Sequence, residues 1–500
     1  MNTPQPATSD VAFGFDNSYA RLPPQFFARQ APTPMPAPQV IRLNAPLAAF
    51  LGLREEAVAP GLVDQLFSGS ALPNDAEPLA MAYAGHQFGG FAPQLGDGRA
   101  VLLGELVGSD GIRRDVQLKG AGRTPFSRGG DGRAALGPIL REYIVSEAMH
   151  AFGIPTTRAL AAAVTGETVL REQPLPGAII TRVAESFVRV GTFQFFAARQ
   201  DYDSVRTLAD YVIARHYPSA EQAEHPYREL IAQVSAKQAA LIAQWMHVGF
   251  IHGVMNTDNM QIAGETIDYG PCAFMDTFHP STVYSSIDRM GRYAYANQPT
   301  IGHWNLACFA SSLLPLLNDD EDAAVTEARA AIEDFPEKFQ TAWRAGMAEK
   351  FGFTNPDDTD VKLGQEFLHL LDTQNADYTL AFRRLAELAD DDPSTSETLG
   401  ALFDDASELH LWLRRWRDRA DRESTTGSER QSKMQQVNPV YIPRNHLVEA
   451  TIQSALQGDL KPFHALTTTL ETPYVRQEGC EAFELPPEPA EVVHQTFCGT

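Results

Sequence analysis

The sequence is poor in cysteine and in basic residues, and each shortage excludes a class of protein. Its cysteines, Cys272, Cys308, Cys480 and Cys498, show no CxxC or Cys/His spacing, so we expect reduced thiols rather than a zinc site. Lys and Arg total 40 against 63 Asp and Glu, which gives a net charge of −23. Such an acidic surface repels phosphate backbones, and we therefore expect no nucleic-acid partner.

Long apolar segments are also missing. No uninterrupted apolar run reaches the roughly 18 residues that a membrane span needs, so we expect no membrane partner. The first residues form neither a signal-peptide core nor an Arg-rich transit segment, and the expected location is the cytoplasm. Because the acidic surface also repels nucleotides, a nucleotide site would need a local cluster of Arg, Lys and backbone N–H groups.

The pattern along the chain predicts an α+β fold that changes from strands to helices near residue 200. Strand signals occur in AVLLGELV, DVQLKG, AIITRVAE and FVRVGTF. Pro138 opens a helix that is expected at about 139–152. Helical segments such as SAKQAALIAQWMHVGF dominate afterwards, and the polar residues 420–437 are expected to form an exposed loop.

Strands followed by helices, with a catalytic-type loop in the helical part, are the plan of a protein-kinase-like bilobal fold. We expect a β-rich N-lobe, a helical C-lobe, a proline-rich N-terminal arm and a C-terminal helical extension. The expected boundaries are 1–80 for the arm and cap, 81–200 for the N-lobe, 201–345 for the C-lobe with its catalytic loop, and 346–500 for the helical extension and a redox-candidate tail.

The segment 249–270, GFIHGVMNTDNMQIAGETIDYG, has the layout of a kinase catalytic loop, H-x-D-x-x-x-x-N, followed by D-F-G. His252 opens the loop. Val254 stands where a kinase has the Asp that orients the acceptor hydroxyl, and a valine binds neither a proton nor a metal. The segment therefore favours a protein that holds a nucleotide and a metal without running ordinary kinase chemistry.

Three polar side chains of this segment are candidates for that chemistry. Asn259 stands at the metal-binding Asn position, and Asp268 opens DYG in place of DFG. Both offer the hard oxygen ligands that suit Mg²⁺ or Mn²⁺ bridging phosphates. Asp258 is the only carboxylate beside them and is the candidate general base.

A glycine-rich loop and a strand-end lysine suggest phosphate binding. In QLGDGR, Gly96 and Gly98 let backbone N–H groups approach phosphate and Arg99 can neutralise it, although G-D-G is also an ordinary hairpin turn. Lys119, in VQLKG, stands where a kinase places its phosphate-binding lysine.

A kinase lysine pairs with a glutamate of the following helix, and two candidates are present. On a helical wheel Glu147 falls near the centre of the apolar face of helix 139–152, whereas Glu142 lies off it. A carboxylate within an apolar face needs a partner, so the pattern alone favours Glu147.

Arginines add positive charge near these motifs. The loop GAGRTPFSRGGDGRAALG holds Arg123, Arg128 and Arg133, a local reversal of sign that a polyphosphate site needs in an acidic protein. Arg182 and Arg189 lie on the later strand segments, as phosphate ligands or as members of structural ion pairs.

Together these motifs resemble the selenoprotein O family of kinase-like protein adenylyltransferases, over about residues 85–500. The matching segments are GHQFGGFAPQLGDGRA, DVQLKGAGRTPFSRGGDGRA, LREYIVSEAMHAFGIPTTRAL, ESFVRVGTFQFF, HGVMNTDNMQI, IDYGPCAFMD, NPVYIPRNHLVEATI and the terminal Cys. Cys498 occupies the position at which animal members carry selenocysteine. It is a redox candidate, and a disulfide with Cys272 is one option.

The resemblance implies that ATP binds in a flipped orientation, that AMP is transferred to Ser, Thr or Tyr hydroxyls of proteins, and that pyrophosphate leaves. Transfer of UMP from UTP stays open. Asp258 would accept the proton, and Asn259 and Asp268 would bind Mg²⁺ or Mn²⁺. Against the helical-wheel argument, Glu142 would pair with Lys119. The implied nucleotide contacts are Gly96, Gly98, Arg99, Lys119, Asp131, Gly132, Arg182, Arg189 and Asp268.

Two other functions stay open on the residues alone. One is a phosphotransferase, against which Val254 argues. The other is an inactive nucleotide-binding scaffold. The presence of Lys119, Asn259 and Asp268 together argues against the scaffold, because a scaffold needs no metal ligands.

Overall fold

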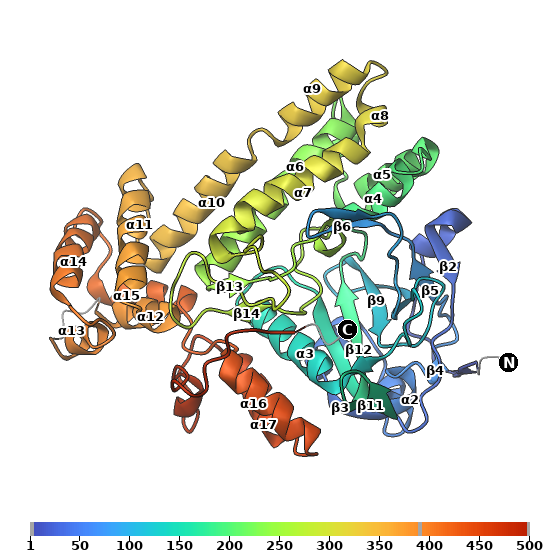
Figure 1. Ribbon diagram of the computed structural model, residues 1–500, viewed down its shortest axis with the longest axis horizontal. Helices are drawn as coiled ribbons and strands as arrows, with labels where there is room; N and C mark the ends of the chain where they lie inside the picture. Colours follow the sequence, from blue (N-terminus) through green and yellow to red (C-terminus); the bar gives the residue numbers. More distant parts are fainter. Residues whose placement is uncertain (1–4, 389–392, 498–500) are drawn as a thin grey trace.

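An eight-stranded sheet and a large set of helices make up this mixed α/β protein (Figure 1). The computed structural model describes residues 5–388 and 393–497. All pairings within this sheet are antiparallel. In spatial order its strands are β2 (Phe27–Arg29), β5 (Leu79–Met81), β8 (Ala100–Val107), β9 (Arg113–Lys119), β12 (Pro174–Ala184), β11 (Arg158–Leu170) and β3 (Gln39–Leu43), and β10 (Ala134–Ala135) also pairs with β12.

The strands expected at AVLLGELV, DVQLKG and AIITRVAE are confirmed as β8, β9 and part of β12. These three strands are neighbours in the sheet, and their register places Lys119 opposite both Ala100 and Ile180. The lysine thus ends a central strand, with β12 and its Arg182 directly beside it.

The fourth expected strand, FVRVGTF, is wrong, because the chain turns into helix α4 (Val190–Ala197). Arg189 is the last extended residue, and its backbone N–H donates to Thr192 Oγ1 at 3.1 Å, which closes the first turn. Nearly all of α4 is buried, so its apolar residues carry no helical periodicity that would distinguish it from a strand.

The loop expected at 420–437 is also wrong in part, because α15 (Gly427–Val437) lies within it. The helix begins with a capping box. Thr426 Oγ1 accepts from the Glu429 N–H at 3.3 Å, and the Glu429 carboxylate accepts from the Thr426 N–H at 3.0 Å. The polar composition concealed this T-x-x-E start signal.

The expected N-terminal arm is an integral part of the sheet. Strands β2 and β3 form its two opposite edges, so the segment 27–43 reaches across the whole sheet. The other α-helices and strands before β5 are β1 (Ala7–Thr8), α1 (Ala45–Phe50), α2 (Leu62–Leu66) and β4 (Ala71–Leu72), and β1 pairs with β4 in parallel.

Helix α3 (Leu136–Ala151) lies between the sheet and the C-terminal part of the chain (Figure 1). One side packs on β11 and β12, and the other contacts α16 (Asn445–Leu456) and α17 (Lys461–Leu470). Tyr143 and the fully buried Phe463 meet there with ring centroids 5.6 Å apart. The C-terminal helices thus hold α3 against the sheet.

The remaining helices form two groups. A bundle around α6 (Pro226–His247) carries the short strands β13 (Phe250–Ile251) and β14 (Ala273–Phe274) at one end, and a second group lies farther from the sheet (Figure 1). The bundle contains α5 (Tyr202–His216), α7 (Gln298–Ser312), α8 (Leu314–Leu317), α9 (Glu321–Ile332) and α10 (Phe335–Lys350). The second group contains α11 (Asp358–Thr373), α12 (Tyr378–Glu387), α13 (Pro393–Gly400), α14 (Ser407–Ala420) and α15.

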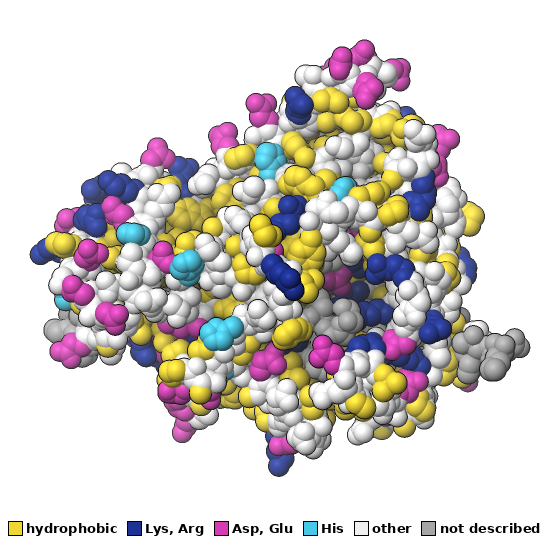
Figure 2. Space-filling view, viewed as in Figure 1, with side chains coloured by type: hydrophobic (Ala, Val, Ile, Leu, Met, Phe, Trp, Pro, Cys, Tyr) yellow, Lys and Arg dark blue, Asp and Glu magenta, His cyan; other side chains and the backbone are white. Residues whose placement is uncertain are grey.

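Across the described residues, no helix combines the length and apolarity needed to cross a membrane. Figure 2 shows dark-blue Lys and Arg side chains grouped in front of the β9–β12 part of the sheet, although acidic residues outnumber basic ones in the whole chain.

Replacing Phe463 by Ala should lower the free energy of unfolding by about 3–5 kcal/mol, because it leaves a cavity between α17 and α3. Urea denaturation followed by tryptophan fluorescence measures the change. The exposed Lys461→Ala, on the same helix, is the matched control. Equal stability of the two variants would contradict the clamping role of α17.

Candidate active site

A cavity of about 470 Å³ lies between the sheet, α3 and the segment 254–271. It brings together nine residues that are far apart in the sequence and that the motifs had singled out. These lining residues are Gly98, Arg99, Lys119, Glu142, Arg182, Arg189, Asp258, Asn259 and Asp268.

Three other predicted nucleotide contacts do not line this cavity. Gly96 packs under Phe126, where a Cβ would come within 2.3 Å of the ring. Asp131 forms an ion pair with Arg171 at 2.8 Å. Gly132 has φ +70° and touches the Gly122 backbone so closely that a Cβ would lie 2.1 Å from it. These residues shape the loop 120–133 beside the cavity.

Asp268 is surrounded by three cations. Its Oδ1 lies 3.1 Å from Lys119 Nζ and 2.7 Å from Arg182 Nη1, and its Oδ2 lies 2.7 Å from Arg189 Nη1. Burial alone would raise the pKa of Asp268, but Lys119, Arg189 and Arg182 together hold it well below its usual range. The carboxylate is therefore ionised at every physiological pH. Its φ of +61° is a left-handed conformation that Asp tolerates better than most residues.

Glu142 completes the cluster. Its Oε2 lies 2.6 Å from Lys119 Nζ, and its Oε1 lies 3.1 Å from Arg182 Nη1. The helical-wheel argument for Glu147 is wrong, since that carboxylate binds Arg158 at 2.8 Å and accepts from Asn44 Nδ2 at 2.7 Å. The helical wheel correctly indicated that Glu147 needs a cation as partner. It does not show that this cation is Arg158 rather than Lys119.

Asp258 is a further carboxylate of the cavity, and it is almost fully buried. Gln87 Nε2 donates to its Oδ2 at 3.1 Å, while Oδ1 has no hydrogen-bond partner among the described residues. Oδ1 packs against Gly85, where a Cβ would lie 2.3 Å away. Burial raises the pKa of Asp258 to about 6, so the group can exchange a proton near neutral pH.

Asn259 is oriented by the backbone. Its Nδ2 donates to the Val254 carbonyl at 2.9 Å, which leaves the amide oxygen available as a ligand. With Asp268 it supplies hard oxygen donors, and such donors fit Mg²⁺ or Mn²⁺ when phosphate oxygens complete the coordination. Among the described residues no group of three His, Cys, Asp or Glu is placed to hold a metal by protein side chains alone.

Two arginines of the cavity have no anionic partner among the described residues. Arg99 and Arg128 both line it and form no ion pair there, whereas Arg133 binds Glu167 at 2.8 Å and faces elsewhere. Unpaired guanidinium groups at the edge of a polar cavity are suited to phosphate oxygens.

The motifs missed a hairpin that holds the catalytic-type loop. Strands β6 (Gly85–Gln87) and β7 (Gly90–Ala92) form it, and besides Gln87 it contacts the loop through the His86 N–H, which donates to Thr257 Oγ1 at 2.7 Å. Tyr83 was missed as well, and its ring lies 4.6 Å from the Arg189 guanidinium. The glycine pattern GHQFGG indicates a hairpin but not where it docks. The redox candidate Cys498 lies outside the described residues.

The site is thus a polar cavity that combines clustered cations, several carboxylates and an amide oxygen, as expected for an enzyme that acts on phosphate esters. The family model described as "Protein adenylyltransferase SelO" matches residues 11–471. The protein nucleotidyltransferase YdiU of Rhizobium johnstonii is 59% identical over 491 residues, which cover 98% of each chain. The protein nucleotidyltransferase YdiU of Rhodopseudomonas palustris (strain BisB5) is 58% identical over 491 residues, which cover 98% of this chain and the full length of the relative. The chain belongs to the SelO family of protein adenylyltransferases.

Replacing Arg99 by Ala should weaken ATP binding about tenfold or more, because one charge-assisted contact to phosphate is lost. Since Arg99 has no ion pair to break, the melting temperature should stay unchanged. Calorimetric titration with ATP measures the affinity, and the exposed Arg329→Ala is the control. Unaltered affinity in the Arg99 variant would contradict a phosphate contact.

Proposed function

We propose that this enzyme transfers AMP from ATP to Ser, Thr or Tyr hydroxyls of proteins and releases pyrophosphate. The family and the names of the relatives support nucleotidyl transfer to protein. The observation that carries the proposal is the charge cluster on Asp268, in which Lys119, Arg182 and Arg189 converge on one carboxylate inside a cavity.

Those cations are matched to a triphosphate. In the described state these three cations pair with two carboxylates, Asp268 and Glu142, so the cluster keeps one positive charge in excess. A nucleotide with its metal brings both phosphate charge and countercharge, and the same side chains can then turn to phosphate oxygens. As pyrophosphate leaves it gains charge, and Arg182 and Arg189 are the buried cations available to stabilise it.

Asp258 takes the role of general base in this proposal. The hydroxyl oxygen attacks the α-phosphorus, the bond to pyrophosphate breaks, and the hydroxyl proton passes to the Asp258 carboxylate. The pKa of about 6 leaves this group mostly ionised at pH 7 and still basic enough to accept the proton. Val254 cannot replace it, although it occupies the position of the kinase Asp.

The metal we propose is Mg²⁺ or Mn²⁺, held by Asn259 and Asp268 together with phosphate oxygens. When bound, it would neutralise phosphate charge during transfer. The protein's own part is to orient these ligands, through the Val254 carbonyl on Asn259 and through the three cations on Asp268.

We further propose that the architecture is that of a protein-kinase-like bilobal fold with the nucleotide reversed. A strand lysine paired with a helix glutamate, as Lys119 pairs with Glu142, supports the first part. The reversed nucleotide rests on the family, because transfer of AMP requires the α-phosphorus rather than the γ-phosphorus to face the acceptor. UTP as an alternative donor, and the cytoplasm as the compartment that supplies ATP, belong to the same proposal.

The deciding experiment compares label transfer from ATP labelled at the α- or the γ-phosphate, to the protein itself and to cell extract, with Mg²⁺ or Mn²⁺. Label from the α-position only, lost in Asp268→Ala and on addition of a chelator, is the expected result. Label from the γ-position only would identify a kinase. No transfer in the presence of bound ATP would favour the scaffold.

Replacing Asp258 by Asn should reduce AMP transfer at least about 100-fold while ATP still binds, because the amide keeps the Gln87 contact but accepts no proton. Initial rates and calorimetric titration separate the two effects. Full activity of this variant would remove Asp258 from the mechanism.

A further inference from the structure

A cavity of about 540 Å³ lies between the C-terminal halves of α6 and α10. Its lining residues come from the segments 240–248 and 342–350, and 151–154, 436–437 and Tyr474 complete the wall. None of these residues also lines the candidate active site. The volume is typical of a small-molecule site.

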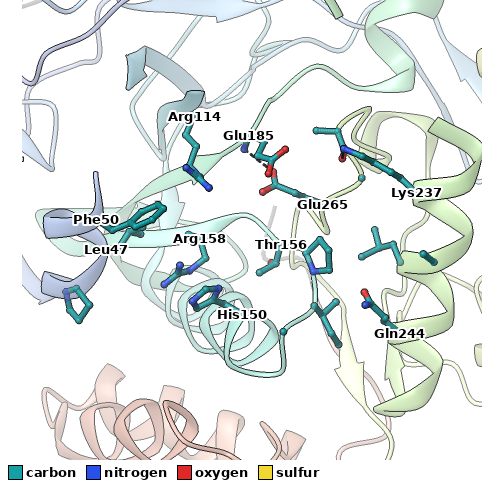
Figure 3. A pocket seen from close by; sticks show the side chains of 18 residues that line it. Leu47, Phe50, Arg114, His150, Thr156, Arg158, Glu185, Lys237, Gln244 and Glu265 are labelled. Carbon is teal, nitrogen blue, oxygen red and sulfur yellow. Dashed lines mark hydrogen bonds between the residues drawn. The ribbon is translucent and has the colours of Figure 1, made fainter. Parts of the chain in front are cut away.

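This cavity adjoins the larger cavity of Figure 3, of about 750 Å³, with which it shares Gln244 of α6. The arginines of the larger cavity are paired with carboxylates. Arg114 binds Asp110 and Arg158 binds Glu147, each at 2.8 Å. The smaller cavity instead contains a cation without a partner of opposite charge.

That cation is Lys350, whose side chain is buried with only 3% of the residue exposed. Among the described residues its Nζ forms no ion pair and no hydrogen bond. The ring centroids of Phe382 and Tyr378 lie 4.0 and 5.5 Å from Nζ. Such cation–π contacts offset part of the cost of burying the charge, but they leave the N–H donors without acceptors. Burial lowers the pKa of Lys350 to about 7.

The spacing along α10 directs this lysine to the cavity. Gly346 lies one turn earlier on the same face of the helix, and a Cβ there would lie 2.4 Å from the His247 ring. His247 therefore packs directly on α10 at the cavity wall. Burial and the nearby Lys350 lower the pKa of His247 to about 3, so the imidazole is neutral. Lys350 is thus the only cation of the lining, and Glu349, its only carboxylate, is exposed.

Much of the remaining wall is apolar. Its larger apolar side chains are those of Phe152, Ile154, Val248 and Val437. The hydroxyl of Tyr474 is already used, since it donates to the Phe152 carbonyl at 3.2 Å. A ligand that fits this lining needs one anionic group and an apolar body.

We propose that this cavity binds a small apolar monocarboxylate, of the kind of a medium-chain fatty acid, with its carboxylate accepting hydrogen bonds from Lys350 and its chain along the apolar wall. An alkylamine would meet Lys350 as a like charge. An alcohol of the same chain length would bring no charge to pair with the amine. A short acid such as acetate would leave the apolar wall uncovered.

Calorimetric titration of the full chain with octanoate tests the proposal. The matched probes are octylamine, which carries the opposite charge, 1-octanol, which carries none, and acetate, which lacks the chain. We expect one saturable site for octanoate, with affinity about tenfold or more above that of each of the other three. Saturating ATP should leave this binding in place, because the two cavities share no lining residue.

Proton uptake identifies the group that receives the carboxylate. A bound anion favours the charged amine, so octanoate binding at pH 8, above the pKa of Lys350, should take up a proton. The neighbouring His247 of α6 and Tyr378 of α12 are uncharged at this pH, and Glu349 is exposed. Titrations in phosphate and in Tris, which differ in heat of ionisation, measure the uptake. Binding without proton uptake would contradict the role of Lys350.

Lys350→Met should weaken octanoate binding at least about tenfold and should keep or raise the melting temperature, because an apolar chain of similar length replaces an unpaired buried amine. The exposed Lys461→Met is the matched control. The proposal is overturned by no saturable binding of octanoate, by equal binding of octylamine or 1-octanol, or by binding that Lys350→Met leaves intact. The comparison of ligands uses the unaltered chain, and none of these readouts depends on AMP transfer.

Discussion

The charge balance around Asp268 fixes how the sheet, α3 and the catalytic-type segment fit together. Lys119 comes from β9, Arg182 from β12, Arg189 from the start of α4 and Glu142 from α3. The free-energy cost of dehydrating each buried ion is offset only by its attraction to the other members of the cluster, so the four elements must meet in one arrangement. Removing one member would leave an uncompensated buried charge, which costs about 3–5 kcal/mol. Chemistry and architecture therefore depend on the same side chains.

The acidic composition of the chain makes that cluster of cations important for binding a nucleotide. A chain with net charge −23 holds few places where a triphosphate can settle, and here the cations are concentrated at one cavity. In the proposed mechanism the carboxylate that accepts the proton is Asp258, whereas the kinase position for it holds Val254. The hairpin β6–β7 supports this arrangement, because Gln87 holds Asp258 and Gly85 lets it approach. The loop thus keeps Asn259 and Asp268 at the kinase metal positions, and the proposed base lies at another position.

The sequence predicted the central strands and most of the cavity, because these are encoded locally. A short apolar run marks β8 and alternating apolar and polar residues mark β9. Residue type alone identifies Asp258, Asn259 and Asp268 as oxygen donors. The features that the sequence did not predict depend on contacts between residues far apart in the chain. Buried α4 has no polar face to show its period, and a helical wheel cannot see that Arg158 lies beside Glu147. Likewise, Asp131 and Gly132 belong to a glycine-rich motif typical of phosphate-binding loops. They instead shape a neighbouring loop, because Arg171 and Gly122 lie against them.

The two edge strands have a consequence for how the chain is assembled during synthesis. Strand β3 is made well before its partner β11, which ends only at Leu170, and β2 is likewise made before its partner β5. Strand β3 is therefore unpaired while more than a hundred further residues are made, and β2 waits for a shorter stretch that ends at β5. Pairing at such sequence separation is slow, because a long loop loses conformational entropy on closing before the strand contacts that offset this loss can form. Prolines between residues 23 and 38 keep this waiting segment extended and poor at pairing with other chains, which suits it to a long delay before it closes both sides of the sheet.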